Sequence, residues 1–126
     1  MYLYKSLHME SILYNKSYEL TLVLIDVAEE LEKKNKQYIS NQLYRCCTSI
    51  SANISEANHA ESKRDFVHKL KISSKESQET KYWLSIIRDK KFLELDEKIW
   101  DSLDYIQRML SKSISTTLKG MSTRAH

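Results

Sequence analysis

The sequence predicts an all-α protein, an antiparallel up-down four-helix bundle in one domain. The 126-residue chain contains no proline and only one glycine, so nearly every residue that interrupts a helix or forms a tight turn is absent. Apolar residues recur at helical spacings of three and four along most of the chain. The predicted loops are so short that consecutive helices must be antiparallel neighbours.

The first helix is predicted over residues 9–34, where apolar residues form two adjoining stripes. One stripe contains Leu20, Leu24, Val27 and Leu31, and the other contains Tyr14, Tyr18, Leu22 and Ile25. A helix that faces only its own core needs an apolar arc of about 100°. The wider arc indicates either that this helix also contacts another subunit or that it is a deeply buried core helix.

The second helix is predicted over residues 40–58 and has two neighbouring seams. Its apolar seam contains Leu43, Cys47, Ile50, Ile54 and Ala57 at alternating steps of four and three, as in a coiled coil. Its polar seam contains Gln42, Arg45, Ser49, Asn53 and Glu56. The polar seam is either a solvated face or a buried hydrogen-bonding strip.

The third helix is expected to begin after Ser62, with Asp65 three residues later, and to end near residue 91. Its core stripe contains Phe66, Leu70, Ser73, Ser77, Thr80, Leu84 and Ile87. The small hydroxyl residues in this stripe allow a neighbouring backbone to approach closely. We expect their hydroxyls to hydrogen-bond to the preceding turn or to a neighbouring helix.

The fourth helix is expected to follow Asp96, which is a good N-cap, and to end at Gly120 as a C-terminal cap. Its seam contains Ile99, Leu103, Ile106 and Leu110. The bundle is therefore predicted to occupy residues 1–120, with residues 121–126 as a disordered tail.

The N-terminal residues and the cysteines predict a cytoplasmic protein. No charged segment followed by an apolar run opens the chain, and no stretch is long and apolar enough to span a membrane. Cys46 and Cys47 are adjacent, and neighbouring positions in a helix point about 100° apart, so a disulfide between them would be strained. Reduced, inert thiols are the simpler interpretation.

The motifs argue against an enzyme, a metal site, a cofactor or a small-molecule substrate. Glu56 and His59 have the Glu-x-x-His spacing of di-metal bundles, but such a site needs a second motif of this kind and two further glutamates. No second Glu-x-x-His occurs in the chain. Phosphate-binding and dinucleotide-binding loops need glycines that the chain lacks.

A hairpin folded about residues 60–61 brings Arg45 level with Glu76, and Gln42 level with Glu79. We expect a buried ion pair that fixes the helix register, with Ser49, Asn53 and Ser73 satisfying the remaining donors. Removing Arg45 would then cost roughly 3 kcal/mol. The alternative is an exposed pair of little energetic consequence.

Positive charge is concentrated on the third helix. Residues 63–91 contain nine basic and four acidic residues, whereas residues 92–110 contain two basic and five acidic residues. One line of residues faces away from the core stripe: Arg64, His68, Lys71, Lys75, Gln78 and Tyr82. Such a line is suited either to a phosphate backbone with one stacked base or simply to solvent.

Several segments carry a family resemblance across about residues 14–118. They are KSYEL at residues 16–20, QLYRCCTSISANISEA at residues 42–57, SKRDF at residues 62–66 and KESQETKYWL at residues 75–84. With these segments the chain resembles a bacterial four-helix-bundle family, the ribosomal RNA intervening-sequence proteins, related to accessory proteins of diversity-generating retroelements. The chain departs from the family pattern at Cys46, Cys47 and Ser51, where Ser, Gly and Gly are expected, so helix packing there should be slightly wider.

The resemblance implies a homopentamer around a central opening, with no catalytic activity. In the retroelement relatives it further implies a basic surface that engages nucleic acid and a reverse transcriptase. We therefore expect a non-enzymatic homo-oligomer that binds RNA or DNA through the third helix. The alternative is a structural or protein-interaction module without nucleic-acid binding.

Overall fold

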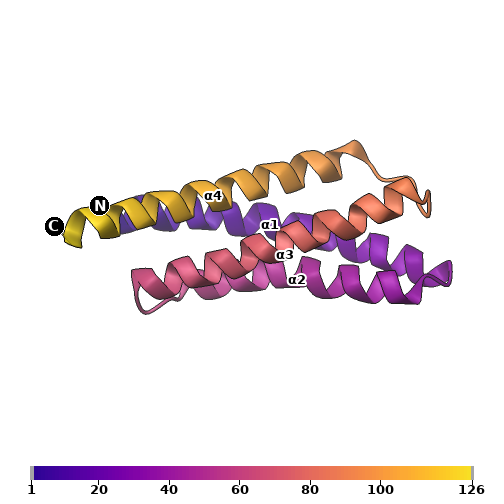
Figure 1. Cartoon of the computed structure of the whole chain (residues 1–126), viewed down its shortest axis with the longest axis horizontal. Coiled ribbons are helices and arrows are strands. Elements are labelled where there is room, and N and C mark those ends of the chain that lie inside the picture. Colours follow the sequence, from indigo (N-terminus) through magenta and orange to yellow (C-terminus); the bar gives the residue numbers. More distant parts are fainter. Residues whose placement is uncertain (1, 126) are drawn as a thin grey trace.

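Four antiparallel helices make up the part of the chain that the structure describes, which confirms the predicted fold class. The computed structural model covers the backbone of residues 2–125 and the side chains of residues 12–122. The helices are α1 (Tyr2–Lys33), α2 (Gln37–Asn58), α3 (Lys63–Asp89) and α4 (Glu97–Ala125). Both termini and the α2–α3 turn lie at one end of the bundle, and the other two turns lie at the opposite end (Figure 1).

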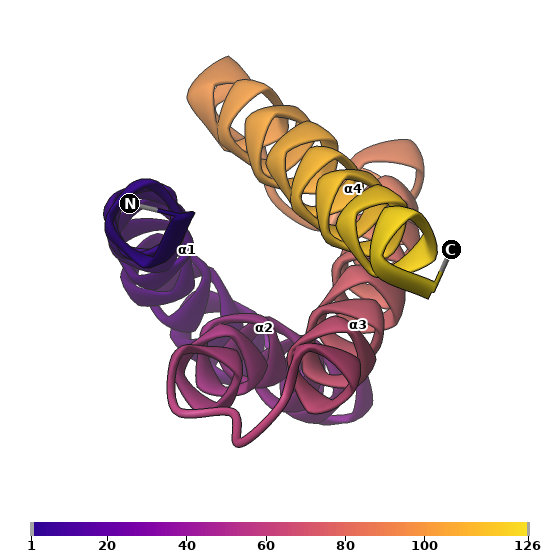
Figure 2. The same ribbon diagram turned by 90° about the vertical axis from the view of Figure 1, so that its left-hand side faces the viewer.

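Each helix packs against two others in a closed ring. Contacts join α1 to α2, α2 to α3, α3 to α4 and α4 back to α1. Figure 2 shows this arrangement from the end that carries the termini, with the α2–α3 turn toward the viewer. No helix within the described residues is both long enough and apolar enough to cross a membrane.

The helix boundaries differ from the predicted ones at several points. α1 begins at Tyr2 and α2 at Gln37, each earlier than predicted, and α3 ends at Asp89. α4 continues through Gly120 to Ala125, so Gly120 is not its cap, and the helix covers residues for which a disordered tail is predicted. The domain limit at residue 120 stays a prediction.

Two turns contain a residue other than glycine in the left-handed conformation, which glycine usually adopts at the end of a helix. Asn35 after α1 and Lys91 after α3 adopt positive φ angles of 62° and 56°. In the first turn Lys36 N donates to the Leu31 carbonyl at 2.8 Å, and in the second Phe92 N donates to the Ile87 carbonyl at 3.0 Å. These bonds are typical of a Schellman ending, which satisfies carbonyls that the helix leaves free.

The predicted N-terminal caps are confirmed. The Ser62 hydroxyl accepts a hydrogen bond from Asp65 N at 3.0 Å. The Asp96 carboxylate accepts one from Lys98 N at 2.9 Å. Both side chains satisfy backbone amides that have no partner within the helix, so they fix where α3 and α4 begin.

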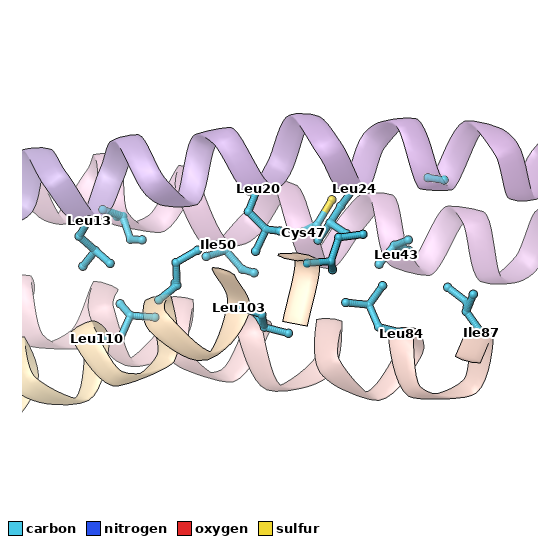
Figure 3. Packing of buried hydrophobic residues seen from close by; sticks show 14 of the residues in the cluster. Leu13, Leu20, Leu24, Leu43, Cys47, Ile50, Leu84, Ile87, Leu103 and Leu110 are labelled. Carbon is cyan, nitrogen blue, oxygen red and sulfur yellow. The ribbon is translucent and has the colours of Figure 1, made fainter. Parts of the chain in front are cut away.

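The core is a continuous apolar cluster with contributions from all four helices (Figure 3). Small hydroxyl residues line the contact between α2 and α3, and the buried ones include Ser73, Ser77 and Thr80. Ser73 Oγ donates to the Ile50 carbonyl across the contact at 2.8 Å. Thr80 Oγ1 donates to the Glu76 carbonyl at 2.8 Å within its own helix. The predicted use of these hydroxyls is therefore confirmed, and no buried oxygen among these three lacks a partner.

Candidate nucleic-acid interface

The outer face of α3 carries the predicted line of cations, which we call the basic stripe. All six of its side chains are exposed: Arg64, His68, Lys71, Lys75, Gln78 and Tyr82. Residues three and four apart lie on the same side of a helix, and the buried positions Leu70, Ser73 and Ser77 occupy the opposite side. The residues of the basic stripe therefore form one solvent-exposed surface, because they recur at the period of the helix.

The cations of the basic stripe have no carboxylate partner among the described residues. Arg64, Lys71 and Lys75 form none of the ion pairs found there. The neighbouring Lys69 differs, because its Nζ lies 3.4 Å from Glu56 Oε1 on α2. The positive charge of the basic stripe is therefore open to an external anion.

The polar residues between α2 and α3 adopt the predicted register. Arg45 forms ion pairs with both Glu76 and Glu79 and donates to Gln42 Oε1 at 3.2 Å. The expectation of a buried pair is wrong, because the Arg45 side chain is 50% exposed. The small residues Ser73, Ser77 and Thr80 of α3 are buried, whereas the longer Arg45 side chain reaches solvent.

Ser49 and Asn53 do not join the Arg45 group through any hydrogen bond that the structure shows. Asn53 Nδ2 instead donates to the Ser49 carbonyl at 2.8 Å, one turn earlier in α2. The polar network predicted from the sequence therefore divides into an inter-helix ion-pair group and a local contact within α2.

An aromatic cluster of Tyr38, Tyr82 and Trp83 lies beside this ion-pair group. The rings of Tyr38 and Trp83 meet edge-on with centroids 6.0 Å apart, and those of Tyr82 and Trp83 with centroids 5.1 Å apart. Trp83 Nε1 donates to Glu79 Oε2 at 3.2 Å, so a hydrogen bond fixes the central indole. Sequence reasoning included Tyr82 but missed the other two rings, although the same hairpin register brings Tyr38 level with Trp83.

The two thiols are buried and contact only other parts of the bundle. Burial raises the pKa of the Cys46 thiol, although a hydrogen bond from Thr80 opposes this change. Burial also raises the pKa of Cys47 to about 12. Both side chains are free cysteines without solvent exposure, so they have neither the access nor the acidity of a nucleophile.

Glu56 and His59 bind different partners and do not converge. Glu56 pairs with Lys69, and His59 Nδ1 lies 3.0 Å from the Ser55 carbonyl. Among the described residues no three side chains of the metal-binding types come together. These two residues are therefore accounted for by contacts at the end of α2.

A cavity of about 420 Å³ lies at the turn between α3 and α4. Its lining residues all follow the basic stripe in the sequence. Trp100 forms part of its wall, and the Arg88 guanidinium stacks over that ring at 4.8 Å. Lys91, Glu94 and Glu97 add charges of both signs. No residue predicted to be functional lines this cavity.

α1 exposes apolar side chains that its own chain does not cover. Tyr18, Leu22 and Val23 are each nearly half exposed, at 46%, 47% and 46%. Tyr14 and Ile25 are partly buried against the core. The second apolar stripe of α1 is therefore not deeply buried within one chain.

The comparisons place this bundle in a known family. The fold is that of a small four-helix bundle with an exposed basic face on α3. Residues 9–112 match the 23S rRNA-intervening sequence protein family. The chain belongs to that family. No curated protein matches it at a significant level.

A solved structure supports the same assignment. It is the crystal structure of a protein of unknown function from the S23 ribosomal protein family of Bacteroides thetaiotaomicron. The two proteins share 32% sequence identity and a TM-score of 0.80, with 85% of this chain and 98% of that chain covered. Neither description names a catalytic activity.

Proposed function

We propose that this protein is a non-enzymatic, cytoplasmic helical bundle that binds RNA or DNA through the basic stripe of α3. One observation carries the proposal: Arg64, Lys71 and Lys75 share one exposed face and have no carboxylate partner among the described residues. Cations of this kind neutralise phosphates and release condensed counterions, which provides affinity without sequence selection. His68 lies on the same face, and Tyr82 ends it with an aromatic ring.

We further propose that the protein assembles into a homo-oligomer, a pentamer, through the exposed apolar face of α1. The support is the partial exposure of Tyr18 and Leu22, since apolar side chains clustered on one helix mark interaction surfaces. Assembly would repeat the basic stripe around a ring, and linked weak sites bind more tightly than single ones. A reverse-transcriptase-like partner, implied by the family resemblance alone, stays a prediction.

The nucleic-acid proposal is tested by reversing two charges of the basic stripe. The Lys71→Glu, Lys75→Glu variant should bind labelled single-stranded RNA at least tenfold more weakly at low salt. The slope of log affinity against log salt should fall by about 0.7 for each phosphate that the variant no longer neutralises. Fluorescence anisotropy over a salt series measures both quantities.

A matched control carries the same change of charge on another helix. Lys98 and Lys112 are exposed on α4, so a Lys98→Glu, Lys112→Glu variant has the same net charge as the test variant. It should retain most of the affinity. Equal binding by the parent and the α3 variant would replace the proposal with a structural or protein-interaction module, and so would a parent protein that binds no nucleic acid at low salt.

The assembly proposal is tested by placing a charge on the apolar face of α1. Leu22→Glu should shift the mass measured by light scattering from an oligomer toward a monomer. Leu118→Glu introduces the same charge at a comparably exposed leucine of α4 and should leave the mass unchanged. A parent protein that is monomeric at micromolar concentration would contradict the proposal.

A further inference from the structure

The aromatic cluster of Tyr38, Tyr82 and Trp83 has more exposed ring surface than packing of the bundle requires. Tyr38 is 69% exposed and Tyr82 is 59% exposed, even though both rings contact Trp83. Large aromatic side chains usually contribute to stability by being buried. Two rings that stay mostly in solvent beside a fixed indole leave aromatic surface for a ligand.

The cluster continues the basic stripe and is not a separate surface. Tyr82 belongs to both, and Lys75 precedes it by seven residues on the same face of α3. Seven residues of helix rise by about 10 Å, which is the length of about three stacked nucleotides at roughly 3.4 Å each. A phosphate held at Lys75 would therefore leave a nearby base within reach of the Tyr82 ring.

The acidic residues next to the rings share one cation, which halves their net negative charge. Glu76 and Glu79 form ion pairs with Arg45, and Glu79 also accepts the hydrogen bond from the Trp83 indole. Without Arg45 these carboxylates would repel a phosphate chain beside the cluster. The ion pairs with Arg45 thus reduce the repulsion that a polyanion beside the aromatic rings would meet.

We propose that Tyr38, Tyr82 and Trp83 form a base-stacking platform, so that the ligand of this face is a single strand or unpaired loop of RNA or DNA and not a duplex. This inference rests on the proposed nucleic-acid binding and specifies its ligand. In a duplex the base faces are already stacked on each other, whereas an unpaired base is free to stack on a protein ring. The platform has no hydrogen-bonding pattern for one base, so binding tolerates many sequences.

The experiment uses Trp83 as its own reporter. The chain contains two tryptophans, so a Trp100→Phe background leaves Trp83 as the only one. A labelled oligouridylate and a duplex of the same length are titrated separately at one salt concentration. We expect the single strand to bind more tightly than the duplex and to quench the Trp83 emission.

Ring substitutions separate stacking from charge. Tyr38→Ala and Tyr82→Ala should each weaken single-strand binding by roughly 5- to 150-fold, the range typical of alanine substitution at a ring that stacks on one base. The salt slope should stay near that of the parent, because the cations that neutralise phosphates are unchanged. Tyr38→Phe and Tyr82→Phe keep the ring and should bind like the parent, and circular dichroism confirms that all four variants are folded.

The failures of the two proposals are distinguishable from one another. If both alanine variants bind single strands as tightly as the parent while the Lys71→Glu, Lys75→Glu variant does not, the stacking platform is wrong and the proposed function stands. Duplex binding as tight as single-strand binding would also overturn the platform, as would binding without any change in Trp83 emission. A parent protein that binds neither nucleic acid would overturn both proposals.

Discussion

The side of α3 that faces α2 and the outer side of α3 both carry polar and charged residues. The residues on the α2 side have bonding partners within the chain, whereas the cations on the outer side face solvent. On the α2 side, Ser73 bonds to the Ile50 carbonyl, and Glu76 and Glu79 pair with Arg45. On the outer side, the cations of the basic stripe find no carboxylate among the described residues. Groups satisfied within the chain contribute to register and stability, whereas exposed and unpaired charges of one sign are available to a partner.

The difference predicts that stability is concentrated on the α2 side. Leu84 is fully buried in the shared core, so Leu84→Ala should lower the free energy of unfolding by about 2 to 5 kcal/mol through reduced burial and a residual cavity. Urea unfolding followed by circular dichroism measures the change. A decrease below about 1 kcal/mol would show that α3 does not depend on this contact.

The buried Cys47 thiol of α2 makes the stability of the bundle sensitive to high pH. The pKa of Cys47 is about 12 in the folded protein against an ordinary value of 9.0. Below pH 9 the thiol is protonated in both states, and its contribution to stability is fully present. As pH rises from 9 toward 12, the unfolded thiol ionises while the folded one stays neutral, so this contribution falls by about 1.4 kcal/mol per pH unit.

This effect is measured by difference, so that the contribution of Cys47 is separated from those of all other groups. Unfolding in urea is compared at about pH 8 and about pH 10.5, under reducing conditions, for the parent and Cys47→Ala. The stability of the parent should fall by about 2 kcal/mol more than that of the variant over this interval. Equal decreases would mean that Cys47 reaches solvent in the folded state.

Arg45 combines features of both sides of α3, because it is ion-paired like the residues of the α2 side and half exposed toward solvent. Arg45→Ala should cost about 1 kcal/mol or less, since an ion pair whose arginine is half exposed contributes little. The roughly 3 kcal/mol expected from the sequence presumed burial. A double-mutant cycle with Glu79→Gln isolates the pair, and a coupling energy near about 3 kcal/mol would restore the buried interpretation.

The outer side of α3 should be almost neutral for stability. Replacing both Lys71 and Lys75 by glutamine should change the free energy of unfolding by less than about 0.5 kcal/mol, because surface positions without partners rarely contribute more. Relief of repulsion among like charges can make the change a small gain. Urea unfolding at low salt tests this, and a large decrease would mean that the two lysines stabilise the fold after all.

Much of the bundle was predictable from local pattern alone. Apolar spacing located all four helices, and Ser62 and Asp96 marked where two of them begin. The scarcity of glycine was less informative about how helices end, because Asn35 and Lys91 adopt the left-handed conformation in its place. Gly120 failed as a stop signal, since a single glycine costs a long helix only about 1 kcal/mol.

The candidate site was predictable to a smaller extent. The basic stripe follows from helical periodicity, which places Arg64, Lys71 and Lys75 on one face whatever the helix packs against. The burial of Arg45 and the meeting of Tyr38 with Trp83 depend on how far α2 and α3 stand apart and on which edge of their contact each residue occupies. The wider packing expected at Cys46, Cys47 and Ser51 stays a prediction.

The sequence by itself determined the helices, the hairpin register of α2 and α3 and the face of α3 that carries the basic stripe. These properties depend on spacing within one helix or on a short turn, which are local quantities. Only the tertiary structure decided that Arg45 and Leu22 are each about half exposed. It also decided that a hydrogen bond to Glu79 fixes the Trp83 indole between two exposed rings. Exposure is set by all neighbouring helices together, so no stretch of sequence fixes it alone.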